Sequence, residues 1–128
     1  MSDVTVTALK KATRDLLYPS ESDEPFRVFH WKGRHGPLTS EELLKITKQD
    51  PDTPVEEISL DDFFSELTEE QGLDEEDARK FQNLRKVIEE QLTDVRVFRV
   101  GEVKIDVYIV GKTKDGDWAG VKTSSVET

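Results

Sequence analysis

Residues 95–110, with the sequence VRVFRVGEVKIDVYIV, decide the fold class of this 128-residue chain. The β-branched and aromatic run at 95–100 meets a Gly101-Glu102 turn and returns at 103–110, a pattern that predicts a β-hairpin. Apolar and polar residues alternate in the second strand, whereas the first carries apolar side chains on both of its faces. Apolar residues on both faces indicate a sheet that helices cover on both sides.

The segments around this hairpin predict one more strand after it and mostly helices before it. Asp115-Gly116 indicates a type I′ turn into a strand at 118–126. Apolar residues at i, i+3, i+7 and i+11, with Asp74 as the N-cap, predict a helix at 75–92. Further helices are expected at 5–17 and after the N-cap residues Thr39 and Ser59, and further strands at 26–33 and 55–58.

These elements predict a single domain spanning residues 1–128, which is long enough to bury a core without disulfides. The chain has no cysteine. We expect an α+β fold, specifically a three-layer α/β/α sandwich around a mostly antiparallel sheet. The N-terminus lacks the apolar region of a signal peptide, and no stretch approaches the roughly 18 apolar residues of a membrane span. A cytoplasmic protein without membrane contact is therefore expected.

The negative charge of the chain is concentrated in one segment. The formal net charge is −10, and residues 50–78 contain 13 Asp or Glu and no Lys or Arg. Direct binding to nucleic acid requires clustered basic residues, so this composition argues against it. A basic partner surface or a multivalent cation would be attracted instead. The alternative interpretation of such a run is a solvated face that aids solubility.

No pattern in the sequence indicates catalysis. His30 is expected in a strand as a packed or partly exposed sheet residue, and His35 lies in the turn sequence GRHGP. Neither belongs to a helical His-x-x-x-His motif or a facial triad. No phosphate-binding loop and no Gly-x-Ser-x-Gly elbow is present. The residues alone thus predict a binding protein that is not an enzyme and needs no cofactor.

Three segments closely resemble the nuclease A inhibitor (NuiA) family. They are LLYPSESDEPFRVFHW (16–31), KFQNLRKVIEEQL (80–92) and VFRVGEVKIDVYIVGKTKDGDWAGVKTSSVET (97–128). The resemblance implies an inhibitor of a magnesium-dependent, sugar-non-specific endonuclease that cuts DNA and RNA. Such an endonuclease has a ββα-metal active site with a basic cleft. The implied fold is an α/β/α arrangement of the kind found in pathogenesis-related proteins.

The resemblance also implies how the inhibitor works. In the family, the C-terminal threonine reaches the catalytic Mg²⁺ of the nuclease, and the acid within the SES segment meets arginines of the nuclease. These positions correspond to Thr128 and Glu21. Mg²⁺ prefers oxygen ligands, so a carboxylate or hydroxyl can replace a phosphate oxygen there. The residues expected to bind the partner are Glu21, Asp23, Glu24, Leu73, Asp74, Glu127 and Thr128.

One segment departs from the family pattern. The family has an Asp-Trp pair at the interface before the long helix, whereas this chain has Gly72-Leu73 in a shorter loop. Loss of an aromatic anchor can remove about 2 kcal/mol of binding. An acidic interaction module that mimics phosphate but no longer inhibits a nuclease is therefore the alternative function. In the same way, Glu21 can be a loop acid that bonds backbone amides, and Leu73 can be a core residue.

Overall fold

The computed structural model describes residues 2–14, 16–18, 24–31, 39–65, 75–102, 104–114 and 116–126. Its centre is a five-stranded antiparallel sheet with the strand order β3-β7-β6-β5-β4. These strands are β3 (Arg27–Trp31), β4 (Val55–Ile58), β5 (Thr93–Val100), β6 (Lys104–Lys112) and β7 (Trp118–Val126). A two-stranded antiparallel pair is formed by β1 (Leu17–Tyr18) and β2 (Glu24–Pro25). The helices are α1 (Ser2–Thr13), α2 (Ser40–Ile46), α3 (Leu60–Ser65) and α4 (Glu75–Gln91).

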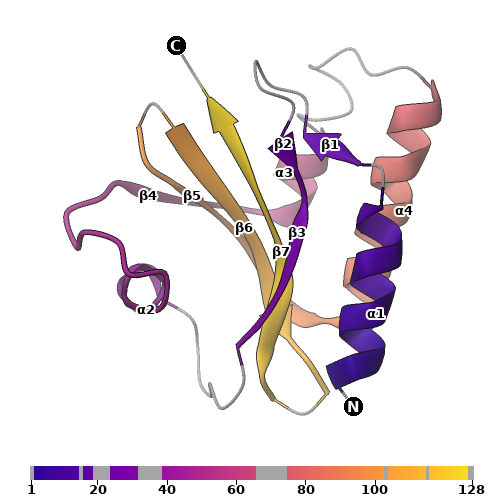
Figure 1. Ribbon diagram of the computed structural model, residues 1–128, viewed down its shortest axis with the longest axis horizontal. Helices are drawn as coiled ribbons and strands as arrows, with labels where there is room; N and C mark the ends of the chain where they lie inside the picture. The colour runs from indigo at the N-terminus through magenta and orange to yellow at the C-terminus, as the bar shows by residue number, and fades with distance from the viewer. Residues whose placement is uncertain are drawn as a thin grey trace.

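Helices lie on both faces of the sheet (Figure 1). Helices α1, α3 and α4 cover one face, and α2 is the one described helix on the other. The confirmed features are the α+β class and the antiparallel sheet. The full three-layer sandwich stays a prediction, because α2 has only seven residues and covers only part of its face. None of the described helices is long and apolar enough to span a membrane.

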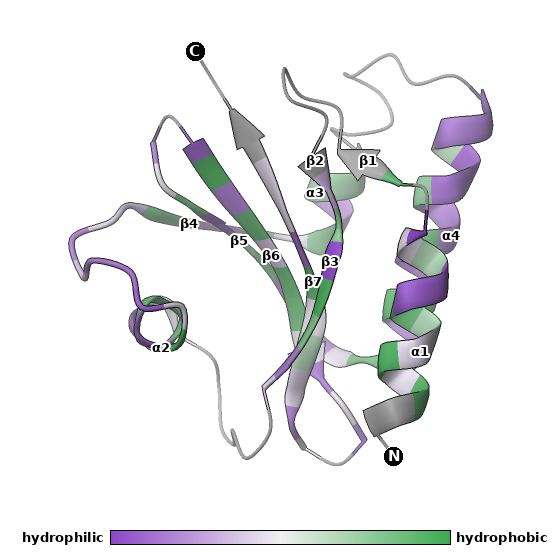
Figure 2. Ribbon diagram, in the orientation of Figure 1, coloured by the Kyte–Doolittle hydropathy of each residue, from purple (hydrophilic) through white to green (hydrophobic). Residues whose placement is uncertain are grey.

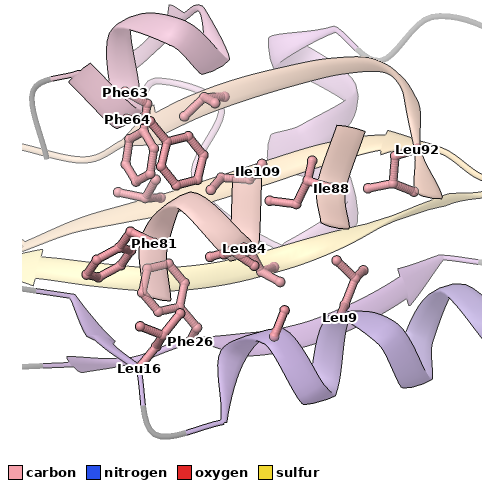
Figure 3. Packing of buried hydrophobic residues seen from close by; sticks show 14 of the residues in the cluster. Leu9, Leu16, Phe26, Phe63, Phe64, Phe81, Leu84, Ile88, Leu92 and Ile109 are labelled. Carbon is pink, nitrogen blue, oxygen red and sulfur yellow. The ribbon is translucent and has the colours of Figure 1, made fainter. Parts of the chain in front are cut away.

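The hydrophobic core is divided by the sheet into two clusters. The larger one lies between the sheet and helices α1, α3 and α4, where Leu9, Phe81 and Ile88 are almost completely buried (Figure 3). The smaller one lies under α2 and includes Leu43 and Phe98. Figure 2 shows the apolar residues of α1 and α4 turned toward the sheet. The expectation that the sheet is apolar on both faces is confirmed, because neighbouring residues of β5 belong to different clusters.

Local sequence signals explain where the helices begin. The backbone N–H of Glu42 donates to Thr39 Oγ1 at 3.2 Å, so Thr39 caps α2 as predicted. Ser59 caps α3 in the same way, since its Oγ accepts from the N–H of Asp62 at 3.0 Å. The predicted N-cap of α4, Asp74, lies outside the described residues.

Two predicted elements are corrected. The first helix covers residues 2–13 rather than 5–17, because Thr13 Oγ1 donates back to the Leu9 carbonyl and Leu16 leaves the helix to enter the core. The β6–β7 connection is longer than a two-residue type I′ turn. The N–H of Gly116, whose φ is +86°, donates to the Thr113 carbonyl, and the Thr113 N–H donates to the Asp117 carbonyl. A single glycine with positive φ is typical of a three-residue hairpin loop.

Candidate partner-binding surface

The residues that the resemblance assigns to the partner are mostly outside the part of the chain that the structure describes. Of the seven, only Glu24 is described, as a backbone position in β2. The others lie outside it; they are Glu21, Asp23, Leu73, Asp74, Glu127 and Thr128. Their contacts therefore stay predictions. The described residues on either side of them nevertheless define the surface from which these segments leave the fold.

The end of β7 is held firmly by its neighbours. β7 pairs with β6 up to Val126, which lies opposite Lys104. On one face, Ser124 Oγ donates to Asp106 Oδ1 at 2.9 Å. On the other, Thr123 Oγ1 donates to the Pro25 carbonyl at 3.1 Å, and the Thr123 side chain is only 3% exposed. The last described residue before Glu127 therefore belongs to a paired strand, as the sequence predicts.

The β1–β2 pair anchors both ends of the segment 19–23, which contains Glu21 and Asp23. Tyr18 lies opposite Glu24 across the pair. Beyond β2, the ring of Phe26 is buried against the ring of Phe81 from α4, with the ring centroids 5.8 Å apart in an edge-to-face arrangement. The Pro25 carbonyl also binds β7 through Thr123. The flanks of this segment are thus connected both to the end of β7 and to α4.

A network around Arg85 joins α3 to α4, the two helices on either side of residues 66–74. Arg85 Nη2 donates to Asp61 Oδ1 and Arg85 Nε donates to Glu89 Oε1, each at 2.8 Å. The guanidinium also lies 6.0 Å from the centroid of the Phe64 ring. Hydrogen bonds to Glu89 and Asp61 raise the pKa of Arg85, so the side chain stays charged.

These three flanking regions lie at one end of the molecule. Figure 1 shows the β1–β2 pair, the beginning of α4 and the end of β7 at the same end, which also carries the turn between β5 and β6. Elements far apart in the sequence thus have these ends at the same end of the molecule. This placement is compatible with a single binding surface, although the described residues do not test the roles of the seven predicted residues.

Most described acids of the segment 50–78 are exposed, yet several form ion pairs with bases elsewhere in the chain. The pairs across different elements are Glu56–Arg99 and Glu57–Arg96, both at 3.7 Å, and Asp61–Arg85 at 2.8 Å. Within α4, four ion pairs join residues at i and i+4. Exposed pairs contribute about 0–1 kcal/mol each. Sequence reasoning missed the pairs across elements, because they depend on strand order and helix packing.

The one histidine that the structure describes, His30, is partnered by an acid. His30 Nε2 lies 3.1 Å from Asp117 Oδ2, and the two side chains are 12% and 15% exposed. The interpretation of His30 as a partly exposed sheet residue is confirmed by its place in β3. Within the described ranges, no group of three or more His, Asp or Glu side chains could hold a metal ion. His35 lies outside these ranges.

The described residues form an acidic α+β domain with an antiparallel sheet between helices. A comparison with known families defines the class more closely. The sequence matches the nuclease A inhibitor-like protein family over residues 3–128, and the chain belongs to this family. A search of curated proteins found no match.

Proposed function

We propose that this protein inhibits a magnesium-dependent, sugar-non-specific endonuclease that cuts DNA and RNA. The observation that carries the proposal is membership of the nuclease A inhibitor-like family over nearly the whole chain. The net charge of −10 supports it, because a nuclease cleft that binds phosphate is basic. The protein acts as one domain of residues 1–128 and catalyses no reaction itself.

The proposed mechanism is occupation of the nuclease active site. Oxygen atoms of Thr128 contact the Mg²⁺ of the nuclease, which belongs to the partner and not to this chain. Glu21 accepts charge-assisted hydrogen bonds from arginines of the nuclease, and Asp23, Glu24 and Glu127 add negative charge nearby. The paired end of β7 supports this mechanism, because a tail that starts from a held strand loses less conformational entropy on binding.

The other contact is made by residues 72–74, between α3 and α4. Leu73 supplies apolar contact where the family has a tryptophan, and Asp74 lies next to the acidic first turn of α4. The acidic segment 50–78 raises the rate of association with a basic cleft. The partner of this proposal is a ββα-metal endonuclease, and the inhibitor itself makes no direct contact with nucleic acid.

The alternative function is an acidic interaction module that mimics phosphate without inhibiting a nuclease. The observation that favours it is Gly72-Leu73 in place of the Asp-Trp pair of the family. An aromatic anchor at an interface contributes about 2 kcal/mol or more, so its loss lowers affinity at least about 30-fold. The two functions differ in one result, which is whether a nuclease is inhibited.

The test is a titration of the purified protein into a ββα-metal endonuclease, with DNA and RNA substrates assayed in parallel at saturating Mg²⁺. We expect the cleavage of both substrates to stop near one inhibitor per nuclease. A magnesium-dependent nuclease of a different fold serves as the control, since simple chelation of Mg²⁺ by an acidic protein would slow both enzymes. Unchanged cleavage across several ββα-metal nucleases would refute inhibition, and binding without inhibition would favour the alternative.

A further inference from the structure

A pocket of about 290 Å³ opens where the start of β4 meets the turn between β5 and β6. Its position places it close to the end of β7, because Ile105 in its wall lies opposite Ser125 in the β6–β7 register. The turn between β5 and β6, which contributes Gly101 to the pocket, lies at the same end of the molecule as the end of β7 (Figure 1). It is lined by Pro54, Val55, Glu56, Arg99, Gly101 and Ile105.

The wall formed by the turn is held in place by its backbone. The N–H of Gly101 donates to the Pro54 carbonyl at 2.9 Å, which ties the turn to the residue before β4. Gly101 has a φ of +115°, and a Cβ at this position would clash with the carbonyl oxygen of Lys104. Glycine is the residue that adopts this positive φ without strain and has no Cβ to clash. The pocket is consequently a formed feature of the fold and needs little reorganisation to receive a group.

The mouth of the pocket offers one carboxylate as an acceptor. The Glu56 side chain is 66% exposed, and its carboxylate lies 3.7 Å from Arg99 Nη1, beyond hydrogen-bond distance. The carboxylate thus keeps acceptor positions for a second donor. Among the described residues of the lining, Glu56 is the one acid and Arg99 the one base, so the attraction for a cation comes from the net charge of −10 of the whole chain. Pro54 and Ile105 offer an apolar wall for a hydrocarbon stem.

The pocket, at about 290 Å³, is large enough to receive one side chain of a partner. Arginine combines an apolar stem with a planar group that bonds carboxylates, and it is enriched among the residues that dominate protein interfaces. We propose that this pocket receives an arginine side chain of the partner nuclease, with Glu56 as its acceptor. The inference rests on the proposed function for the identity of the partner and adds a contact outside the seven residues predicted from the sequence.

Strand β4 offers a matched control for this contact. Glu57 forms an ion pair with Arg96 at the same distance of 3.7 Å and is 51% exposed, but it points to the opposite face of the sheet. It lies opposite Phe98, which packs under α2, whereas Glu56 lies opposite Arg99 in the pocket. Glu56→Gln and Glu57→Gln therefore remove equal charge from adjacent positions, and only the first alters the pocket.

The experiment measures the inhibition constants of the wild type and both variants against a ββα-metal nuclease. We expect Glu56→Gln to raise the inhibition constant about tenfold or more, as for loss of a hydrogen bond to a charged group. Glu57→Gln should raise it less than about twofold, because it changes only long-range attraction. Equal effects of the two substitutions would overturn the inference while leaving the inhibitor function in place.

A second measurement keeps the pocket testable if no nuclease is inhibited. N-acetyl-arginine amide is titrated into isotope-labelled wild type and into Glu56→Gln, and amide shifts are followed by NMR. We expect the amides of Gly101 and Ile105 to shift in the wild type, with shifts at least threefold smaller in Glu56→Gln. Absence of shifts in the wild type would refute the arginine pocket independently of the proposed function.

Discussion

Replacement of Thr123 by valine tests the connection between the two parts of the proposed binding surface. The Thr123 hydroxyl donates to the Pro25 carbonyl at 3.1 Å, and this bond joins the end of β7 to β2. Thr123 is 3% exposed, so its hydroxyl is shielded from water, whereas Pro25 is an exposed residue. Valine has nearly the same shape as threonine and offers no donor.

The expected loss of stability is that of one hydrogen bond, because Thr123 is buried but the acceptor residue Pro25 is exposed. Such a bond contributes about 0.5–1.5 kcal/mol. For a chain of this length its loss lowers the Tm by about 2–6 °C. The end of β7 and β2 should also be held together less firmly, which weakens binding to the nuclease. The inhibition constant should rise by at most about tenfold, since the loss of binding free energy cannot exceed the free energy of the hydrogen bond that is lost.

Urea unfolding and nuclease inhibition are measured on Thr123→Val together with two controls. Thr123→Ser keeps the hydroxyl. Ser124→Ala removes the neighbouring hydrogen bond to Asp106 on the opposite face of the sheet. Thr123→Ser loses a buried methyl group, so the stability of Thr123→Val is judged against the wild type. We expect Thr123→Val to be less stable than the wild type and to inhibit less well than Ser124→Ala. If Thr123→Val were as stable as the wild type, the bond to Pro25 would contribute nothing and the reasoning would be refuted.

Two further predictions concern the sheet itself. Gly111→Ala should lower the free energy of unfolding by about 1–3 kcal/mol in urea denaturation, because a Cβ there would lie 2.9 Å from both Leu92 Cβ and the Thr93 carbonyl oxygen; unchanged stability would contradict this packing. Burial, reinforced by the charge of Asp106, raises the pKa of Tyr108 to about 12. The hydrogen bonds with Thr47 and Gln49 act in the opposite direction and lower the pKa. The neutral phenol therefore favours the folded state below pH 10, and this contribution is lost as the pH rises through about 12. Alkaline unfolding monitored by circular dichroism should be less steep between pH 10 and 12 in Tyr108→Phe than in the wild type, and identical profiles would refute the assignment.

Local patterns predicted the elements that depend on near neighbours in the chain. The apolar stripe of α4 buries Phe81, Leu84 and Ile88 because a 3.6-residue period places them on one side of the helix. The caps Thr39 and Ser59 act within three residues, so their roles are also visible in the sequence. The turn at Gly101 was predicted only in part: Gly101 has a positive φ, but Val100 lies opposite Asp106, so the connection between β5 and β6 is longer than the predicted Gly101-Glu102 turn.

Features that depend on distant segments could not be predicted in this way. Strand β3 pairs with β7, which places His30 beside Asp117 although 87 positions separate them in the chain. No periodicity carries that information. The pocket at Glu56 is another example, because its walls come from two strands and a turn that meet only in the folded sheet. The type I′ prediction for Asp115-Gly116 was wrong, since loop length depends on where the flanking strands stop pairing.

The candidate site residues were inferred from a family resemblance, whereas the elements of the fold were inferred from local sequence patterns. Composition and periodicity indicated an acidic binding protein but identified no binding residue. The assignment of Glu21, Leu73 and Thr128 came from the resemblance to a family, which the match over residues 3–128 has since confirmed. The individual roles stay predictions, because these residues lie outside the part of the chain that the structure describes.

The central claim is that the last residues of this sequence enter a nuclease active site. The most direct test compares the inhibition constant of the chain of residues 1–128 with that of a variant lacking Glu127 and Thr128. Strand β7 ends at Val126, so the shortened chain should keep its Tm. The account predicts inhibition by residues 1–128 and a loss of about 30-fold or more on truncation, equivalent to about 2 kcal/mol. Equal inhibition by both chains would contradict it.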